Sequence, residues 1–420
     1  MDHFQYRDGA LHAEDVPLAA IAEAVGTPVY VYSRATLTRH ARVFRDALAA
    51  HLPKMHLAFA MKANPNLAVV RTIAREGYGA DIVSGGELER ALAAGIAAQD
   101  IVFSGVGKDA RELARGVEVG IGQFNLESEE EGVELAAIAA AAGKRAVCAL
   151  RVNPDVDAKT HAKISTGKSE NKFGVPCDRA GAIYARLAEL DGLEMRGLAV
   201  HIGSQIGDLS PSRRAFAKMG ALMEQLRTQG LTVSHMDLGG GLGVPYKAGE
   251  ALPDPQEYAA MVGEVTRGWD ATIMFEPGRV IAGNSGVLLT RVIRVKEGIA
   301  APFVVVDAAM NDLTRPAMYD AWHDFVSVAP SGERVTANIV GPICESSDTF
   351  AMGREIDAVA AGDLAVFRTA GAYGATMANT YNSRPLVPEV MVDGDRWAVV
   401  AERIEPATII AAERVPEWLA

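Results

Sequence analysis

The sequence predicts an α/β protein: a (β/α)8 TIM-type barrel over residues 36–280, and a second domain that combines residues 1–35 with residues 281–420. Three observations lead to this prediction. The chain has 420 residues, which is too long for one ordinary core. Short apolar runs alternate with amphipathic stretches through the middle of the chain. After about residue 281 this alternation gives way to short β-rich runs.

Eight short apolar runs carry the barrel prediction. They span residues 55–60, 79–83, 101–103, 121–124, 146–152, 195–202, 234–238 and 272–275. Helix-like stretches rich in Ala, Leu, Glu and Arg lie between them, for example at 86–94, 128–142, 179–190 and 212–229. Strands that alternate with helices pair in parallel through βαβ crossovers, and eight such runs fit a closed barrel better than an open sheet.

The rest of the chain predicts a β-sandwich or open barrel of antiparallel strands. Runs at 287–295, 303–306, 335–340, 364–367 and 397–400 are rich in β-branched residues and are separated by Gly, Pro and Asp. Residues 28–32, before the barrel, also have the composition of a strand. We expect this N-terminal strand to join the second domain, so that the barrel is inserted between two pieces of it.

Composition and charge exclude several classes of protein. Hydrophobic residues make up 49% and charged residues 22%, as in ordinary globular enzymes. The net charge of -12 argues against nucleic acid or an anionic membrane as a partner. The three cysteines have neither disulfide nor zinc spacing, and we expect no metal site. The charged N-terminus does not resemble a signal peptide, so the expected compartment is the cytoplasm.

Polar residues follow most of the eight apolar runs, and Lys62 is the most suggestive of them. Catalytic groups of such barrels lie at the carboxyl ends of the strands. Lys62 comes directly after the first run. Burial favours the neutral amine, which can condense with an aldehyde. A lysine that extends to solvent at the barrel rim explains this position equally well.

Three further strand ends suggest a phosphorylated, aromatic ligand. Gly239-Gly240-Gly241 follows the seventh run, where barrel loops commonly bind phosphate, although a glycine run alone is more often a tight turn. Glu276 ends the eighth run and fits a partner for a pyridinium nitrogen, or an ion pair with Arg279. His201 ends the sixth run and fits a ring that stacks on a flat cofactor or transfers protons, unless it is structural.

The second domain contributes its own candidates. Cys344 and Glu345 lie in a Gly/Pro turn, where a thiol is accessible enough to transfer a proton, although a structural cysteine is the ordinary alternative. Arg315 precedes a proline and offers a guanidinium for a carboxylate. Residues 371–374 and 381–385 are glycine- and aromatic-rich loops of the kind that line pockets.

Together these segments resemble the fold-type III pyridoxal-phosphate-dependent decarboxylases of the alanine racemase-like barrel family, within them the diaminopimelate decarboxylase group. The resemblance rests on Ala60-Met61-Lys62-Ala63-Asn64, Asp81-Ile82-Val83-Ser84-Gly85-Gly86-Glu87, Asn171-Lys172-Phe173-Gly174, His201-Ile202-Gly203-Ser204-Gln205, Gly239-Gly240-Gly241, Glu276-Pro277-Gly278-Arg279, Arg315-Pro316, Gly341-Pro342-Ile343-Cys344-Glu345-Ser346 and Gly371-Ala372-Tyr373-Gly374. These motifs run in order along nearly the whole chain.

The resemblance implies the decarboxylation of meso-2,6-diaminopimelate to L-lysine, with pyridoxal 5'-phosphate as cofactor, in a homodimer whose active sites are shared across the interface. It implies Lys62, Cys344 and His201 as catalytic residues. The implied cofactor-binding residues are Lys62, Asp81, His201, Ser204, Gly240, Gly241, Glu276, Gly278, Arg279 and Tyr373. The implied substrate-binding residues are Arg279, Arg315, Tyr319, Glu345 and Tyr373. Lys62 would hold the cofactor as a Schiff base, and Cys344 of the partner subunit would donate a proton.

Other activities on the same scaffold stay open at this point. A decarboxylase of ornithine or arginine would need an acidic residue without Arg315, because those substrates lack a distal carboxylate. Carboxynorspermidine is harder to distinguish. A racemase would place an arginine where Glu276 lies, and a non-catalytic regulator would lose Lys62 or Cys344.

Overall fold

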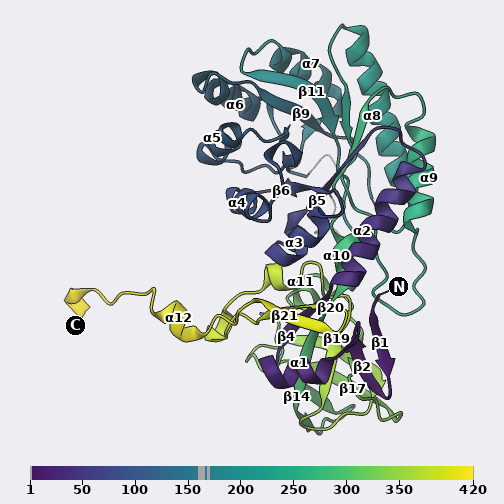
Figure 1. Ribbon diagram of the computed structural model, residues 1–420, viewed down its shortest axis with the longest axis vertical. Helices are drawn as coiled ribbons and strands as arrows, with labels where there is room; N and C mark the ends of the chain where they lie inside the picture. The colour runs from purple at the N-terminus through teal and green to yellow at the C-terminus, as the bar shows by residue number, and fades with distance from the viewer. Residues whose placement is uncertain (1, 159–165, 168–170, 420) are drawn as a thin grey trace. The chain divides into compact units, whose positions relative to one another are not determined.

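The computed structural model describes residues 2–158, 166–167 and 171–419, which divide into two compact units (Figure 1). The first, which we call the sheet unit, comprises Met1–Leu37, Pro245–Glu250 and Ala282–Ala420. The second, the barrel unit, comprises Thr38–Val244 and Ala251–Ile281. The short segment Pro245–Glu250 lies between two barrel strands in the sequence, yet its contacts are made within the sheet unit.

The barrel unit is a closed ring of parallel strands, which confirms the predicted fold class. Its strands are β5 (Met55–Ala60), β6 (Gly79–Ile82), β7 (Ile101–Phe103), β8 (Gln123–Leu126), β9 (Ala146–Asn153), β11 (Leu193–Ala199), β12 (His235–Asp237) and β13 (Thr272–Phe275). Each pairs with the next, β13 pairs with β5, and the pairing of β8 with β9 completes the closed ring. The two-residue strand β10 (Val175–Pro176) adds to β9 outside the ring.

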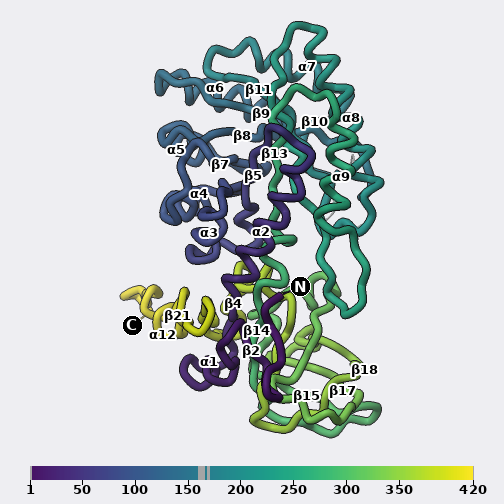
Figure 2. Tube along the Cα trace, turned by 45° about the vertical axis from the view of Figure 1, so that its right-hand side comes forward, coloured from purple at the N-terminus to yellow at the C-terminus, as the bar shows by residue number. Residues whose placement is uncertain are grey.

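Helices surround the ring of strands, as Figure 2 shows for the barrel unit. They are α2 (Arg34–Ala49), α3 (Leu67–Ala74), α4 (Gly85–Ala93), α5 (Ala110–Val119), α6 (Glu129–Ala141), α7 (Cys177–Ala188), α8 (Ser210–Thr228), α9 (Pro255–Val265) and α10 (Arg279–Ala282). Several have strong start signals. Asp109 and Asp254 each form a capping box with a glutamate three residues on, which satisfies the first free N–H groups of α5 and α9.

The predicted strand at 121–124 is displaced along the chain, and this is a correction to the sequence analysis. The observed β8 is Gln123–Leu126, so Asn125 lies inside the strand instead of following it. The polar side chains of Gln123 and Asn125 hide the apolar pattern by which the strand would be recognised. Both are buried, and Gln123 Nε2 donates to Asn125 Oδ1 at 2.8 Å. Buried polar groups need such partners.

The sheet unit contains a nine-stranded sheet that takes in the N-terminal strand β4 (Val29–Ser33), as predicted. Its other strands are β14 (Gly286–Lys296), β15 (Phe303–Val306), β16 (Phe325–Ser327), β17 (Arg334–Val340), β18 (Thr349–Asp357), β19 (Leu364–Phe367), β20 (Glu389–Asp393) and β21 (Arg396–Ala401). The pairings β15–β17 and β20–β4 are parallel, so the sheet is mixed and not purely antiparallel as expected. The long segments that separate these partners in the sequence make a parallel pairing possible.

The remaining elements of the sheet unit are small. Strands β1 (Phe4–Arg7), β2 (Ala10–Ala13) and β3 (Val16–Pro17) form a separate antiparallel sheet before α1 (Leu18–Val25). The core lies between these elements and the large sheet, and it includes Val29, Leu289 and Val366. The helices α11 (Arg315–Tyr319) and α12 (Pro406–Ile410) lie in the second half of the unit.

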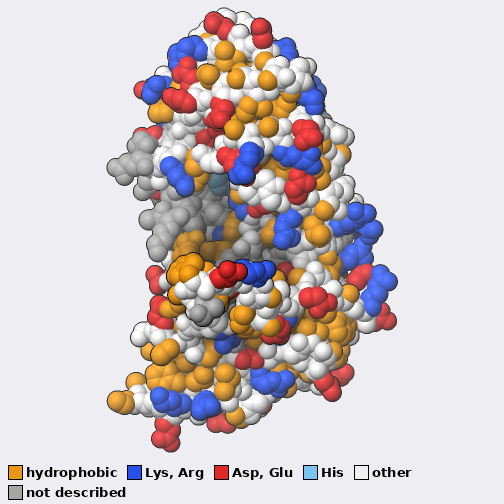
Figure 3. Space-filling view, turned by 90° about the vertical axis from the view of Figure 1, so that its left-hand side faces the viewer, with side chains coloured by type: hydrophobic (Ala, Val, Ile, Leu, Met, Phe, Trp, Pro, Cys, Tyr) orange, Lys and Arg blue, Asp and Glu red, His pale blue; other side chains and the backbone are white. Residues whose placement is uncertain are grey.

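The surface carries mixed charge. Basic and acidic side chains are interspersed on the face drawn in Figure 3, in keeping with the modest net negative charge. Among the described residues, none of the helices is both long and apolar enough to cross a membrane.

Candidate active site

Lys62 lies just beyond the carboxyl end of β5, beside a buried carboxylate. It is in the short 3-10 turn Met61–Ala63 that continues β5. Ala60, two residues before Lys62, is the register partner of Asp81 on β6. The side chains of Lys62 and Asp81 therefore lie at the same end of the barrel. Lys62 Nζ donates to Asp81 Oδ2 at 2.5 Å. The lysine side chain is 36% exposed whereas the aspartate is fully buried, so the amine is accessible at its outer side while its charge is balanced below.

The glycine run after β12 forms a turn that larger residues would block. Gly239 and Gly241 have φ values of +66° and +113°, which other residues rarely adopt. A Cβ at Gly240 would lie 2.2 Å from the Glu276 carbonyl oxygen, and one at Gly241 would lie 2.3 Å from the Gly203 carbonyl oxygen. The turn therefore packs tightly against the ends of β11 and β13 and presents bare backbone there.

His201 follows β11 and lies against this turn. Gly240 N donates to His201 Nδ1 at 3.3 Å, which makes Nδ1 an acceptor. Burial lowers the pKa of His201 to about 3, and the charges of Arg151 and Lys62 act in the same direction. The imidazole is therefore neutral at physiological pH, with its remaining proton on Nε2.

Ser204 and Arg279 join the ends of the sixth and eighth strands. Arg279 begins α10, three residues after Glu276, and donates to Ser204 Oγ from Nε at 3.3 Å and from Nη2 at 3.1 Å. Gly278 lies between Glu276 and Arg279 in the sequence. A Cβ at Gly278 would lie 3.0 Å from the side chain of Ala63, the residue after Lys62. The Glu276-Pro277-Gly278-Arg279 segment thus packs closely on the lysine turn.

Glu276 lies deep in the barrel at the end of β13. Its Oε1 accepts from Ser104 Oγ at 3.2 Å and from Asn125 Nδ2 at 3.3 Å. Burial raises the pKa of Glu276 well above its usual value, and the neighbouring carboxylates Asp237 and Asp81 add to this rise while Lys62 opposes it. The barrel end therefore brings an amine, a neutral imidazole, a glycine turn and a buried carboxyl group together.

In the sheet unit, Arg315 is held by aromatic residues that the sequence analysis did not identify. Its Nη1 lies 2.8 Å from His323 Nε2, and its guanidinium carbon lies 4.5 Å from the centre of the Tyr246 ring. Since arginine only donates, His323 Nε2 accepts, and His323 Nδ1 donates to the Arg368 carbonyl at 2.9 Å. Tyr319 ends the same helix, α11.

Cys344 and Glu345 lie in an exposed loop between β17 and β18, shaped by a buried aspartate. Asp348 Oδ2 accepts from Ile343 N at 2.7 Å, and its Oδ1 accepts from Met310 N at 2.7 Å. The thiol of Cys344 is exposed. Sequence reasoning missed Asp348, although its position four residues after Cys344 is within reach of a turn analysis.

Glu345 has hydrogen-bond donors on two sides. Tyr381 Oη donates to Glu345 Oε2 at 2.9 Å, and Ser347 Oγ donates to Oε1. These two bonds lower the pKa of Glu345, so the carboxylate is fully charged at neutral pH. Tyr373, in the other glycine-rich loop, has a φ of +56°, a left-handed conformation that is uncommon for tyrosine.

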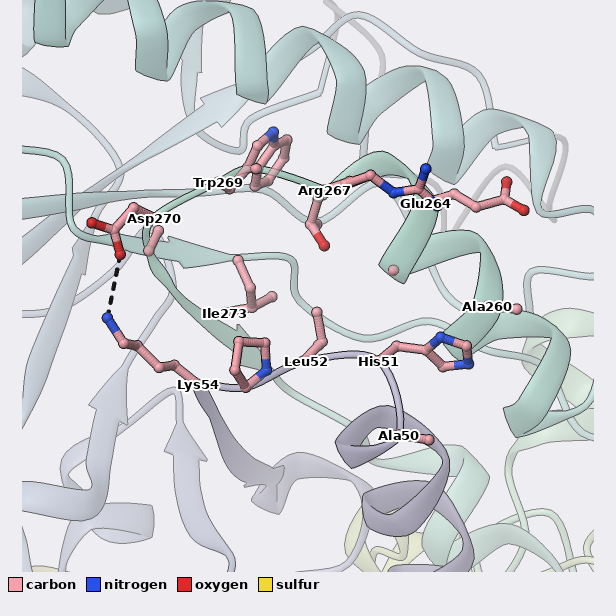
Figure 4. Close-up of a pocket in the computed structure, with 15 residues that line it drawn as sticks. Ala50, His51, Leu52, Lys54, Ala260, Glu264, Arg267, Trp269, Asp270 and Ile273 are labelled. Atoms are coloured by element: carbon pink, nitrogen blue, oxygen red, sulfur yellow. Dashed lines mark hydrogen bonds and ion pairs between the residues drawn. The ribbon is translucent and has the colours of Figure 1, made fainter.

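A large surface hollow lies away from this chemistry (Figure 4). It measures about 720 Å³ and is lined by residues that precede β5 and β13, among them His51, Lys54, Trp269 and Asp270. Lys54 Nζ donates to Asp270 Oδ1 at 3.3 Å across it. Because it lies at the amino ends of the strands, it is on the opposite side of the barrel from Lys62.

The predicted residues therefore form two groups. The barrel unit brings together Lys62, Asp81, His201, Ser204, Gly240, Gly241, Glu276, Gly278 and Arg279 at one end of its strands. The sheet unit holds Arg315, Tyr319, Cys344, Glu345 and Tyr373 in three separate segments. Ser104, Asn125 and Asp237 are polar residues near strand ends, as the sequence indicates, but their grouping around Glu276 was not predicted. Tyr246 and His323 around Arg315 were missed, because their partners are far away in the sequence.

Comparison with known proteins identifies the family. Residues 34–283 match the family described as pyridoxal-dependent decarboxylase, pyridoxal binding domain. The chain is 50% identical to a diaminopimelate decarboxylase of Zymomonas mobilis, and the match covers 99% of both chains. It is 48% identical to the Vibrio cholerae enzyme of the same name, again over 99% of both.

Solved structures agree with this assignment. The crystal structure of diaminopimelate decarboxylase from M. jannaschii in complex with L-lysine has a TM-score of 0.96 and 34% identity, covering 100% of this chain and 99% of that one. The Helicobacter pylori enzyme complexed with L-lysine has a TM-score of 0.90 and 37% identity, covering 94% and 98%. The chain belongs to the pyridoxal-dependent decarboxylase family, within its diaminopimelate decarboxylase group.

Proposed function

We propose that this protein decarboxylates meso-2,6-diaminopimelate to L-lysine and carbon dioxide, with pyridoxal 5'-phosphate as cofactor. The observation that carries the proposal is the placement of the Lys62 amine against buried Asp81 at the barrel end that also holds Glu276. The full-length relatives named above act as diaminopimelate decarboxylases, and two structures of such enzymes contain L-lysine, the expected product.

The residues at the barrel end fit pyridoxal phosphate. Asp81 Oδ1 is buried and has no hydrogen-bond partner among the described side chains and backbone, which suits a site that a polar ligand completes. The Gly239–Gly241 turn leaves no room for Cβ atoms, which suits a phosphate that is bound by backbone N–H groups, with Ser204, the backbone at Gly278 and Tyr373 as further donors. Lys62 supplies the amine for covalent attachment.

The cofactor, when bound, supplies an electron-withdrawing ring that stabilises negative charge on the carbon that loses carbon dioxide. Glu276 would hold the ring nitrogen through a hydrogen bond and would favour its protonated form. His201, neutral at physiological pH, would hold the ring without adding a competing charge. Asp81 balances the charge of Lys62.

The substrate carries both a carboxylate and an ammonium group at its far end, and the proposed residues match this pair. Arg279, Arg315, Tyr319 and Tyr373 bind the carboxylate. The Arg315 guanidinium is well suited, because the Tyr246 ring and His323 hold it in place. Glu345 binds the ammonium as a fully charged carboxylate. Ornithine and free arginine have no distal carboxylate, so as substrates they would offer no anionic group to Arg279 and Arg315.

Cys344 Sγ donates the proton to the carbon that has lost its carboxylate. We propose that it does so across a homodimer interface, with Cys344 and Glu345 completing the site of the partner subunit. The exposed positions of both residues support this arrangement, since an exposed thiol and carboxylate are available to a second chain. Exposed apolar side chains near the C-terminus, including Ile410, Val415 and Trp418, also suit an interface.

Mixing two inactive variants tests the shared site. Lys62→Ala and Cys344→Ala, combined so that subunits exchange, form heterodimers with one intact site out of two. Random exchange at equal amounts makes half of the dimers heterodimers, so about a quarter of the wild-type activity should return. Failure to regain activity, although native mass spectrometry detects heterodimers, would contradict the shared site.

The substrate is tested with the purified, reconstituted enzyme by measuring carbon dioxide release and product identity. Meso-diaminopimelate should give carbon dioxide and an equal amount of lysine, whereas ornithine and arginine should give neither. Carboxynorspermidine is the second candidate substrate and belongs in the same panel. Faster release from carboxynorspermidine or ornithine than from diaminopimelate would overturn the assignment.

We propose the cytoplasm as the compartment. Cys148, Cys177 and Cys344 are all free thiols, and the proposed proton donor requires a reduced cysteine. Fractionation of the producing cells, with activity followed in each fraction, tests this assignment.

A further inference from the structure

Glu276 is not the only carboxyl group inside the barrel. Asp237, the last residue of β12, is also buried and is hydrogen-bonded to Glu276 side chain to side chain. Asp237 Oδ1 accepts from Gly239 N at 2.9 Å, and Oδ2 accepts from Asn125 Nδ2 at 2.9 Å. One aspartate thus connects the buried glutamate to the glycine turn.

The amide of Asn125, on β8, contacts both members of this pair from across the barrel interior. Its Nδ2 lies 2.9 Å from Asp237 Oδ2, 3.3 Å from Glu276 Oε1 and 3.1 Å from Ser104 Oγ. Its Oδ1 accepts from Gln123 Nε2, so the orientation of the amide is set. The network is buried throughout, and it spans four barrel strands, β7, β8, β12 and β13.

The charged groups around the pair determine how many protons it holds. Asp81 on β6 raises the pKa of Glu276 and Lys62 after β5 lowers it, while the charge of Asp237 is close enough to Tyr258 on α9 to raise the pKa of that tyrosine. Burial is the largest influence on both carboxyl groups, and it raises the pKa of each. Two carboxyl groups in hydrogen-bond contact cannot both be ionised in such surroundings, because burial disfavours each charge and the two negative charges would repel one another.

We infer that Asp237 and Glu276 share one proton, and that Asp237 is a positioning residue which orients Glu276 toward the cofactor ring nitrogen. The inference rests on the proposed function in one respect, namely that Glu276 is the partner of that nitrogen. With a single proton, the pair carries one negative charge. In the cofactor-free protein the hydroxyl of Glu276 donates to the Asp237 carboxylate. Transfer of this proton to Asp237 would leave Glu276 as the carboxylate that holds the ring nitrogen, and the same aspartate holds Gly239 in the glycine turn.

Infrared spectroscopy of the cofactor-free protein tests the shared proton directly. The wild-type protein at pH 8 should show a protonated-carboxyl band that shifts in D2O. The band should be missing from Asp237→Asn and from Glu276→Gln alike, because removal of either group leaves the other ionised with hydrogen-bond donors around it. Asp270→Asn, which changes an exposed carboxylate at the other end of the barrel, should leave it intact.

Each alternative outcome is decisive. Absence of the band from the wild type overturns the inference without any variant, which covers the case in which a variant fails to fold. Survival of the band in Asp237→Asn would assign the proton to Glu276 alone, and survival in Glu276→Gln would assign it to Asp237 alone. Both results contradict sharing.

Cofactor affinity tests the positioning role. Asp237→Ala should weaken pyridoxal phosphate binding about tenfold in a fluorescence titration, since it removes the hydrogen bonds to Gly239 and Glu276. Asp237→Asn should restore most of this loss, because an amide can make both bonds. Wild-type affinity in Asp237→Ala would overturn the positioning role. None of these readouts uses a substrate, so failure of the diaminopimelate assay would leave them unaffected.

Discussion

Two glutamates with opposite surroundings carry much of the proposed chemistry. Glu276 is buried inside the barrel beside other carboxyl groups, and its pKa is raised. Glu345 is exposed in a loop of the sheet unit, and hydrogen bonds from Ser347 and Tyr381 lower its pKa. The same residue type is thus prepared to share a proton in one unit and to remain charged in the other.

The difference also separates a group of residues that is buried within its own unit from one that is exposed and is proposed to act with a partner subunit. The barrel group has its hydrogen bonds made by residues of the barrel itself, on strands that cannot move independently. The loop with Cys344 and Glu345 is held at its base by Asp348, but its reactive side chains face outward. We therefore expect substitutions in the barrel to affect cofactor binding, and those in the loop to affect turnover and substrate binding.

The largest effect is expected for Lys62→Ala. Without the amine, the cofactor cannot be attached covalently, and kcat/KM should fall by about 10⁴-fold or more. Borohydride reduction followed by peptide mass spectrometry measures the attachment. Lys54→Ala is the matched control, since Lys54 lies at the opposite end of the same strand. Labelling of another lysine in the Lys62 variant would contradict the assignment.

Cys344→Ala should lower kcat by about 10²- to 10³-fold and change KM by less than about threefold, because the thiol transfers a proton without holding the substrate. Cofactor attachment at Lys62 should be unchanged. Cys177→Ala, which alters a partly buried thiol on α7, is the control. An unchanged kcat in Cys344→Ala would exclude the thiol from the chemistry and would remove the contrast between the two units.

Glu276→Gln should stabilise the cofactor-free protein while it lowers kcat. A raised pKa in the folded state means that the carboxyl group supports folding below the pKa of the unfolded chain, and that this support is lost as pH rises through the folded pKa. Glu276→Gln has no carboxyl group to ionise, so it does not lose this stability. Its free energy of unfolding should therefore exceed that of the wild type by an amount that grows from pH 5 to pH 8 and reaches about 1–3 kcal/mol. Urea midpoints at both pH values measure it.

Glu264→Gln is the control for that experiment, because Glu264 is an exposed glutamate in an ion pair with Arg213. The difference in free energy of unfolding between Glu264→Gln and the wild type should not change between pH 5 and pH 8. A Glu276→Gln protein that is less stable than the wild type at pH 8 would mean that the carboxyl group stabilises the fold, which contradicts the effect of its burial.

The smallest effect is expected for Tyr381→Phe. Loss of one hydrogen bond to Glu345 should raise KM for diaminopimelate about fivefold and leave kcat nearly unchanged. The pKa of Glu345 should rise toward its usual value, so the acid limb of the kcat/KM profile should move to higher pH. An unaltered pH profile would show that Tyr381 does not act through Glu345.

Much of the barrel was predictable from the sequence because each strand has its own apolar run and each helix its own amphipathic pattern. The strand at β8 was misplaced by two residues because Gln123 and Asn125 face the barrel interior as polar groups. The parallel pairing of β15 with β17 was also missed, since the order of strands in a sheet leaves no mark on local composition.

The site was predictable in part for the same reason. Lys62, Glu276 and Cys344 stand out at the ends of strands and in a turn, and the resemblance to a family suggested their roles. Asp237 also lies at a strand end, but its role could not be predicted, because that role depends on contacts such as the one with Asn125, which is 112 positions away. The role of His323 could not be predicted either, because a histidine in a loop has no characteristic pattern. Its role follows from the 2.8 Å contact between its Nε2 and Arg315 Nη1.

The pairing of β4 with β14 and β20 has a consequence for synthesis of the chain. Roughly 250 residues, including the whole barrel, are added between β4 and β14, which takes between about ten seconds and about a minute at ordinary rates of translation. During that time both hydrogen-bonding edges of β4 are without their final partners. The barrel can close before β14 leaves the ribosome, so the protein is expected to assemble from its middle outward, and β4, although made early, is among the last strands to be completed.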